Sequence, residues 1–166
     1  NSAQNWTDNV MNPALPSVYS FVEKVIDEFA AMYHEAGLKL EKVSLGGDEV
    51  PNGVWEKSPK IQALMKREKM KSVHEVWPYY VNKLNEICIA KGLKMAGWEE
   101  FGMVNNGKGM RENKMLRNKS NMQLDVWNNM IGGSQEDLAY RLANAGYPTV
   151  LISASNLYFD MMWDDT

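Results

Sequence analysis

The sequence predicts an α/β fold and, within that class, about half of a (β/α)8 barrel. Segments whose apolar residues have helical spacing alternate with short apolar runs, an order typical of parallel strands joined by right-handed crossovers. Each predicted strand is followed by a carboxylate or an aromatic residue, which fits a barrel whose chemistry gathers at the carboxyl ends of its strands. A complete barrel needs about 250 residues, so the 166 residues predict one partial barrel domain with an open edge.

The chain begins with signals for a helix followed by a strand. Apolar residues between Val18 and Met32 recur three and four positions apart, and Ser17 is a candidate cap in front of them. Gly37 is the candidate end of this helix. The apolar run LEKVSLGG at 40–47 then predicts a buried strand.

Two further helices are predicted in the middle of the chain. Ser58 followed by Pro59 is typical of a helix cap and first turn. Ser72 and Glu75 match a capping box at the start of a longer helix. Pro78 lies too deep in that helix for a regular first turn, so we expect a kink or a later start.

The last third of the chain predicts strands and one helix. The remaining predicted strands are the apolar runs at 93–98, 121–127 and 148–155. Between the last two, Ser134 is the candidate cap of a helix that Gly146 ends. The polar stretch 105–120 is interpreted as a solvated loop rather than as a binding patch.

The composition excludes several classes of function. The formal net charge of -3 argues against a nucleic-acid partner. No apolar run approaches the roughly 18 residues that a membrane span requires. The single cysteine, Cys88, cannot form an internal disulfide and is expected to be a small core residue. No cluster of histidine and cysteine has metal-ligand spacing, so we expect neither a metal nor another cofactor.

The run Leu45-Gly46-Gly47-Asp48-Glu49-Val50 is the strongest candidate for chemistry. Two glycines after a strand permit tight turns and the close approach of a ligand. Two adjacent carboxyl groups repel each other when both are ionised, so one of them can keep its proton and serve as an acid. Alternatively, Asp48 caps the following turn and Glu49 pairs with a lysine; these six residues alone leave both interpretations open.

A longer set of residues resembles glycoside hydrolase family 20, the β-N-acetylhexosaminidases and chitobiases, in which a GGDE run ends the fourth barrel strand. The residues that carry the resemblance are, in order along the chain, 46–51, Trp55, 57–59, 96–100, Trp127 and 158–160. The resemblance implies a partial TIM barrel that comprises about strands 4 to 7 with their helices. It further implies a retaining exo-β-N-acetylhexosaminidase whose nucleophile is the 2-acetamido group of the substrate, an exception to the usual pair of catalytic carboxylates.

The resemblance also implies catalytic roles for particular residues. Glu49 matches the general acid that later activates water, and Asp48 matches the carboxylate that orients the acetamido group. Tyr158 matches the tyrosine whose hydroxyl binds the acetamido oxygen. Ser44 stands where many members carry a histidine.

Further residues match the sugar-binding pocket of the family. Trp98 and Trp127 match walls of the pocket, although either could instead be a core residue. Asp160 matches a carboxylate that binds sugar hydroxyls, with Asp164 and Asp165 as nearby alternatives. Trp55 lines an outer subsite or anchors its loop. Glu99 and Glu100 are interpreted as supporting or surface groups, and Trp77 and Trp163 as structural residues.

The implied partners are oligosaccharides or glycans that end in N-acetylhexosamine, together with the rest of the parent barrel. The family's sugar-binding arginine comes from the first strand and a further tryptophan from the last, so we expect the fragment to be inactive alone. The absence of an initial methionine also suggests a segment of a longer protein. By resemblance, an extracytoplasmic location is expected.

Two other functions are compatible with the same residues. A non-catalytic carbohydrate-binding module would use the aromatic strand ends and would not depend on Glu49. An ordinary glycosidase with two catalytic carboxylates would also cleave glucosides that lack the acetamido group.

Overall fold

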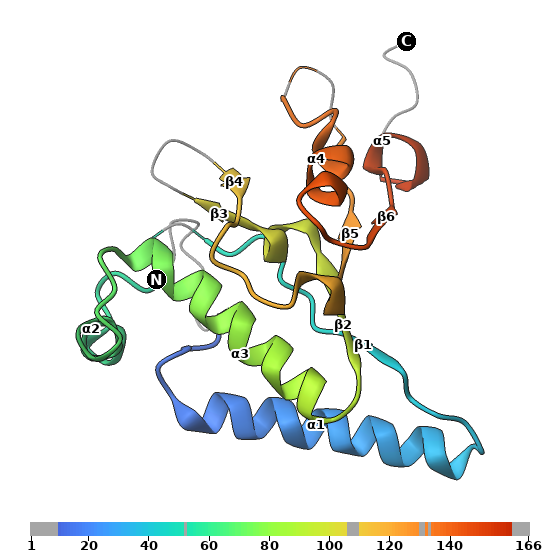
Figure 1. Ribbon diagram of the computed structural model, residues 1–166, viewed down its shortest axis with the longest axis horizontal. Helices are drawn as coiled ribbons and strands as arrows, with labels where there is room; N and C mark the ends of the chain where they lie inside the picture. The colour runs from blue at the N-terminus through green and yellow to red at the C-terminus, as the bar shows by residue number, and fades with distance from the viewer. Residues whose placement is uncertain (1–9, 52, 106–109, 130–131, 133, 161–166) are drawn as a thin grey trace.

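The computed structural model describes residues 10–51, 53–105, 110–129, 132 and 134–160 (Figure 1). Its elements follow in the order α1 (Pro16–Glu35), β1 (Lys42–Ser44), α2 (Pro59–Arg67), η1 (Val73–Glu75), α3 (Val76–Ala90), β2 (Lys94–Trp98), η2 (Glu99–Gly102), β3 (Met103–Asn105), β4 (Met110–Glu112), η3 (Lys119–Asn121), β5 (Met122–Val126), α4 (Leu138–Asn144), β6 (Thr149–Leu151) and α5 (Ala154–Leu157). The helix α3 lies against β2, and α1 packs alongside α3.

The principal sheet is parallel, with the strand order β1-β2-β5-β6. Ser44 pairs with Ala96, Trp98 with Asp125, and Val126 with Leu151. The carboxyl ends of all these strands therefore meet at one edge of the sheet, which is where a (β/α)8 barrel places its chemistry. The predicted α/β class is confirmed, and the described strands form part of a barrel.

The first strand departs from its prediction as a buried strand. β1 has only three residues, of which Lys42 and Ser44 are exposed. It lies at an edge of the described sheet and pairs only with β2, so one of its sides is uncovered.

The polar stretch 105–120 was predicted as a loop, and part of it is instead a strand. β4 pairs antiparallel with β3 to form a hairpin. Among the described cations of this stretch, Arg117 contacts Glu86 at 2.8 Å, and Lys119 lies 5.0 Å from the centre of the Tyr147 ring. These two cations therefore contact other side chains of the same chain.

The helix ends follow the predictions only where the local signal is strong. Ser58 Oγ accepts a hydrogen bond from the backbone N–H of Ile61 at 3.5 Å, as predicted for a cap. Ser17, predicted as a cap, instead lies inside α1, which begins at Pro16. Proline suits the first helical position because its fixed φ is helical and its missing N–H needs no partner. Gly37 ends this helix with φ of +72°, as predicted.

The longer helix starts later than its capping box suggests. Ser72 makes no side-chain cap, and Glu75 accepts a hydrogen bond from the N–H of Lys71 instead. A 3-10 turn precedes α3, which places Pro78 in the first turn of the helix and confirms the later start. Ser134 is likewise not a cap, because it has φ of +57° and α4 begins only at Leu138.

The core consists of two apolar clusters. The larger one joins the sheet to α1, α3 and α4, and its most buried members include Ile26, Leu84, Met95, Met122, Leu124 and Leu142. The smaller one lies under α2 and contains Trp55, Ile61, Leu64 and Val76. Cys88 is fully buried in the larger cluster, and burial raises the pKa of its thiol to about 11. It is therefore a core residue, as predicted.

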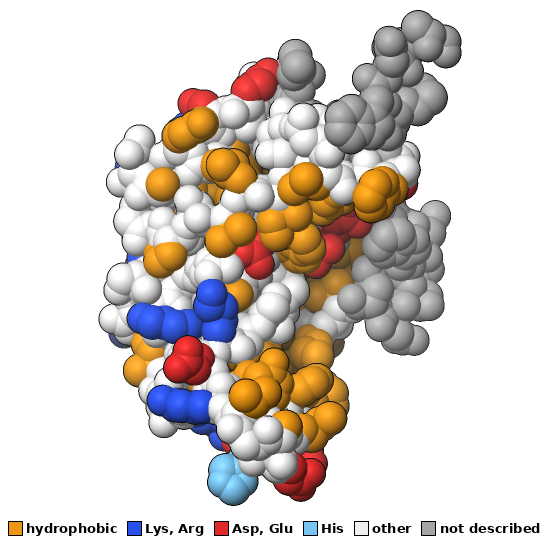
Figure 2. Space-filling model, turned by 90° about the vertical axis from the view of Figure 1, so that its right-hand side faces the viewer, with side chains coloured by type: hydrophobic (Ala, Val, Ile, Leu, Met, Phe, Trp, Pro, Cys, Tyr) orange, Lys and Arg blue, Asp and Glu red, His pale blue; other side chains and the backbone are white. Residues whose placement is uncertain are grey.

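Several large apolar side chains remain on the surface, some of them on the face shown in Figure 2. On α1 these are Phe21, Val25, Phe29 and Met32, and beyond β5 they are Val150, Leu151, Leu157 and Phe159. Exposed apolar residues of this number are typical of surfaces that other parts of a protein cover. Among the described helices, none is both long and apolar enough to cross a bilayer.

Candidate active site

The glycine turn after β1 has a shape that only glycine permits. Gly46 and Gly47 have φ of +74° and +98°. A Cβ atom on Gly47 would lie 2.4 Å from the ring of Phe101, and one on Gly97 would lie 2.2 Å from the same ring. The Phe101 ring thus fills the space between the ends of β1 and β2, and it requires the absence of a side chain at both glycines.

This turn presents the two candidate catalytic carboxylates to solvent. Asp48 and Glu49 are both exposed. Glu49 has φ of +51°, which a residue with a side chain adopts at a cost of about 1–3 kcal/mol. The N–H of Trp98 donates to the carbonyl of Gly46 at 2.9 Å, which continues the pairing with β2 beyond the end of β1. The sheet therefore holds the base of the turn while the acidic side chains extend from it.

A buried carboxylate connects the ends of β2 and β5. Glu99 is only 2% exposed. One of its oxygens accepts the N–H of Trp127 and the other the N–H of Asn128, each at 3.1 Å. The connection continues because the carbonyl of Trp127 accepts the N–H of Ala154 at 2.9 Å, and the carbonyl of Ala154 accepts the N–H of Tyr158 at 3.2 Å. Hydrogen bonds thus link the end of β2 to the candidate residues Trp127 and Tyr158.

The candidate residues also influence one another electrostatically. Burial, followed by the negative charges of Glu99, Asp160, Asp48 and Glu100, raises the pKa of the Tyr158 hydroxyl. The Tyr158 hydroxyl, whose ordinary pKa is already about 10, therefore keeps its proton through the neutral pH range.

The two carboxyl groups of η2, of which Glu99 is buried and Glu100 half-buried, have raised pKa values. Burial raises the pKa of Glu99, the backbone hydrogen bonds from Trp127 and Asn128 oppose that rise, and the charge of Asp48 adds to it. Burial, with the charge of Glu99, raises the pKa of Glu100 to about 7. A carboxyl group with a pKa near neutrality can take up or release a proton at working pH.

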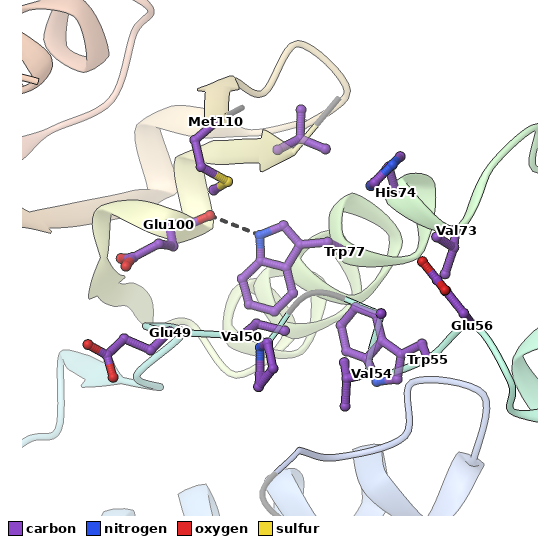
Figure 3. Close-up of a pocket in the computed structure, with 13 residues that line it drawn as sticks. Glu49, Val50, Val54, Trp55, Glu56, Val73, His74, Trp77, Glu100 and Met110 are labelled. Atoms are coloured by element: carbon purple, nitrogen blue, oxygen red, sulfur yellow. Dashed lines mark hydrogen bonds between the residues drawn. The ribbon is translucent and has the colours of Figure 1, made fainter. Parts of the chain in front are cut away.

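A cavity of about 300 Å³ lies beside Glu49. Figure 3 shows Glu49 and Glu100 at one end of this cavity, with their carboxyl groups pointing to the same side, and Trp77 and Trp55 further along it. The indole N–H of Trp77 donates to the carbonyl of Glu100 at 2.9 Å, and its ring stacks on those of Trp55 and Phe101. Trp77, interpreted from the sequence as structural, therefore supports this wall of the cavity.

The remaining predicted residues differ in their surroundings. Trp98 and Trp127 are half-buried at the strand ends, and Asp160 is exposed. Trp55 is only 8% exposed, and its indole N–H donates to the carbonyl of Met11 at 3.2 Å, which favours the interpretation as a loop anchor, although it also lines the cavity. Trp163, Asp164 and Asp165 lie outside the described residues.

Glu99 and Glu100 carry more of the site than the sequence indicated. Both were interpreted as supporting or surface groups, and the burial of Glu99 and the partial burial of Glu100 favour the supporting alternative. The signal was present, because two adjacent carboxylates directly after a predicted strand are the same pattern that singled out Asp48 and Glu49. In the part of the chain that the structure describes, no group of three or more His, Cys, Asp or Glu side chains could hold a metal ion.

Parallel strands whose carboxyl ends carry carboxylates and aromatic side chains define part of the catalytic domain of a (β/α)8-barrel enzyme. The chain belongs to glycosyl hydrolase family 20, since the sequence model of that family's catalytic domain matches residues 1–166.

Individual relatives agree with this assignment. The chain is 30% identical over 166 residues to a β-hexosaminidase of Vibrio vulnificus and 26% identical over 162 residues to β-hexosaminidase B of Pseudoalteromonas piscicida. These matches cover 99% and 96% of this chain but 19% of each relative. The chain therefore spans about a fifth of the length of these relatives.

Solved structures show the same fold. The crystal structure of a GH20 exo-β-N-acetylglucosaminidase from Vibrio harveyi, in complex with N-acetylglucosamine, superposes with a TM-score of 0.72 at 32% sequence identity. The match covers 93% of this chain and 21% of that one. A β-N-acetylhexosaminidase from Bacteroides fragilis superposes with a TM-score of 0.62 at 25% identity.

Proposed function

We propose that this chain forms part of a retaining exo-β-N-acetylhexosaminidase that removes terminal β-linked N-acetylhexosamines from oligosaccharides or glycans. The observation that carries the proposal is the exposed pair Asp48 and Glu49 on the turn after β1, in a chain of family 20. The structure of the Vibrio harveyi relative with N-acetylglucosamine supports the class of substrate.

In the proposed reaction, the substrate supplies its own nucleophile. The carbonyl oxygen of the 2-acetamido group attacks the anomeric carbon, and the bond to the departing glycosidic oxygen breaks. Glu49 donates its proton to that oxygen, so that the leaving group departs as a neutral alcohol. The cyclic oxazolinium intermediate is then opened by water, whose proton returns to Glu49, and the product keeps the β configuration.

Two residues act on the acetamido group itself. Asp48 accepts a hydrogen bond from its N–H and offsets the positive charge that develops on the forming ring. The Tyr158 hydroxyl donates a hydrogen bond to the acetamido oxygen. The raised pKa of Tyr158 supports this role, because it keeps the hydroxyl protonated and thus a donor.

The sugar ring is held by residues at the later strand ends. Trp98 and Trp127 provide flat apolar faces against which the sugar and the acetamido methyl group pack. Asp160 accepts hydrogen bonds from sugar hydroxyls. Strands outside this chain complete the pocket, so we expect the 166-residue chain alone to be inactive.

The proposal is tested by assaying this chain and the whole protein side by side on an aryl N-acetyl-β-glucosaminide and on an aryl β-glucoside. We expect only the whole protein to cleave, only the acetamido substrate to be cleaved, and the first product to be the β anomer by NMR. Equal cleavage of the glucoside would favour an ordinary two-carboxylate glycosidase. Sugar binding without cleavage, unaffected by Glu49→Gln, would favour a carbohydrate-binding module.

A further inference from the structure

Glu99 is a buried carboxyl group that forms no ion pair with the described cations. It is 2% exposed. The ionisable groups with the largest mutual influence on its pKa include Asp48, Glu100 and Tyr158, none of which is a cation. A carboxylate in such a place is costly unless hydrogen bonds satisfy it.

Two of the hydrogen bonds that Glu99 accepts come from one segment. Its two oxygens accept the consecutive backbone N–H groups of Trp127 and Asn128, immediately after β5 ends. Hydrogen bonds from N–H groups to an ionised carboxylate are about twice as strong as those between neutral groups. A carboxylate at position 99 therefore fixes the direction in which the chain leaves β5.

That direction determines where the indole of Trp127 lies. The N–H of Trp127 is bound by Glu99, and its carbonyl is bound by the N–H of Ala154 at the start of α5. With both backbone polar groups held, the Cα–Cβ bond of Trp127 has a fixed direction relative to Asp48 and Glu49 across the sheet edge. A displacement of about 1 Å in a group that positions substrate can lower the rate about a hundredfold.

We propose that Glu99 is a positioning residue that holds the Trp127 indole against the sugar ring in the reaction proposed above. The inference rests on that proposed function for its kinetic consequence, whereas the effect on Trp127 itself is independent of it. Glu99 acts through the backbone of Trp127 and does not touch the substrate.

The test uses Glu99→Gln in the whole protein, because glutamine keeps the shape and one acceptor oxygen but turns an N–H donor toward a backbone N–H. Glu75→Gln is the matched control, since Glu75 also accepts a backbone N–H, from Lys71 at 3.0 Å, but lies in η1. Loss of a charge-assisted hydrogen bond predicts that Glu99→Gln lowers kcat/KM and the affinity for N-acetylglucosamine about 10- to 100-fold. Glu75→Gln should leave both unchanged.

A double-mutant cycle with Trp127→Ala shows whether Glu99 acts through Trp127. If it does, Glu99→Gln costs little further activity once the indole is absent. Fully additive losses in the double variant would overturn the proposal.

A readout that does not need catalysis separates this proposal from the proposed function. In protein labelled with 5-fluorotryptophan, the Trp127 resonance is identified by its loss in Trp127→Phe. We expect Glu99→Gln to shift or broaden that resonance and Glu75→Gln to leave it in place. An unmoved resonance would overturn the positioning role even if the enzyme cleaves as proposed, whereas an inactive wild-type protein with a shifted resonance would overturn only the proposed function.

Discussion

The two ends of the candidate site are built differently. At the end of β1, Asp48 and Glu49 are exposed on a glycine turn, and Glu49 has an unfavourable left-handed backbone. At the end of β5, Trp127 is half-buried, and hydrogen bonds hold both its N–H and its carbonyl. The proposed chemistry explains the difference, because an acid must reach the substrate and exchange protons with water, whereas a surface for a sugar ring must only stay in place.

The largest expected effect is at the exposed end. Glu49→Gln removes the proposed proton donor, and general acid catalysis is worth about 10²–10⁴ in rate. We expect kcat of the whole protein on an aryl N-acetyl-β-glucosaminide to fall about a thousandfold. The loss should shrink as the leaving group becomes more acidic, because such a group needs less protonation. Turnover near that of the wild type would contradict the assignment of Glu49.

Asp48→Asn should have the next largest effect. Asparagine keeps the size of the side chain but lacks the charge that offsets the developing positive ring. Removal of such electrostatic stabilisation typically costs about 10²–10³ in rate, and we expect kcat/KM on the acetamido substrate to fall within that range. An unchanged kcat/KM would show that the charge of Asp48 does not act on the transition state.

The glycine turn can be tested through stability. Gly47→Ala places a methyl group 2.4 Å from the Phe101 ring, at φ of +98°. Gly37→Ala is the matched control, since Gly37 has φ of +72° but no neighbouring atom within 4 Å. Overpacking costs about 1–3 kcal/mol, so urea unfolding should show Gly47→Ala to be less stable than Gly37→Ala by that amount. Equal losses would mean that the Phe101 contact is not restrictive.

The last expected effect, comparable in size at most, concerns the pH dependence of Glu100. Its pKa is raised from 4.5 to about 7 in the folded protein, so between these values the folded state keeps a proton that the unfolded state has lost. The free energy of unfolding therefore decreases as the pH rises through this window. Glutamine cannot titrate, so the Glu100→Gln variant does not show this decrease. Its free energy of unfolding, measured relative to that of the wild type, should therefore increase from pH 5 to pH 7 by at most about 3 kcal/mol. A pH-independent difference would place the pKa of Glu100 near its ordinary value.

The sequence predicted those elements whose signals act locally. Ser58 and Pro59 set the start of α2 because a hydroxyl and a fixed φ act within one turn. Ser72 and Glu75 matched a pattern of the same kind, but Glu75 binds the N–H of Lys71 instead.

The β3–β4 hairpin depended on more distant contacts. Its strand β4 includes Glu112, which pairs with Arg141 on α4 in a salt bridge that the local sequence does not reveal. Long-range pairing of this kind outweighs the polar composition that suggested a loop.

The candidate site likewise combines residues that local sequence identifies with residues whose role depends on distant contacts. Asp48 and Glu49 could be recognised because the residues that define them are adjacent in the sequence. The same pattern indicated Glu99 as a carboxylate of interest, but its specific role could not be recognised, since its partners, Trp127 and Asn128, lie nearly thirty positions further along the chain. Whether a carboxylate after a strand is exposed or buried depends on where the neighbouring strand ends, and that register appears only in the folded sheet.

Phe101 restricts how this region can change by mutation. Its ring leaves no room for a Cβ at Gly47 or Gly97, and Trp77 stacks on it. A methyl group at Gly47 requires a smaller side chain at position 101, and a smaller side chain there removes the support for Trp77. At Gly97 an added Cβ would also lie 2.6 Å from the carbonyl oxygen of Gly46, so a change at position 101 alone does not make room for it. Residues 47 and 101 are therefore epistatic: each single substitution lowers stability, and Gly47 becomes replaceable only when Phe101 changes with it.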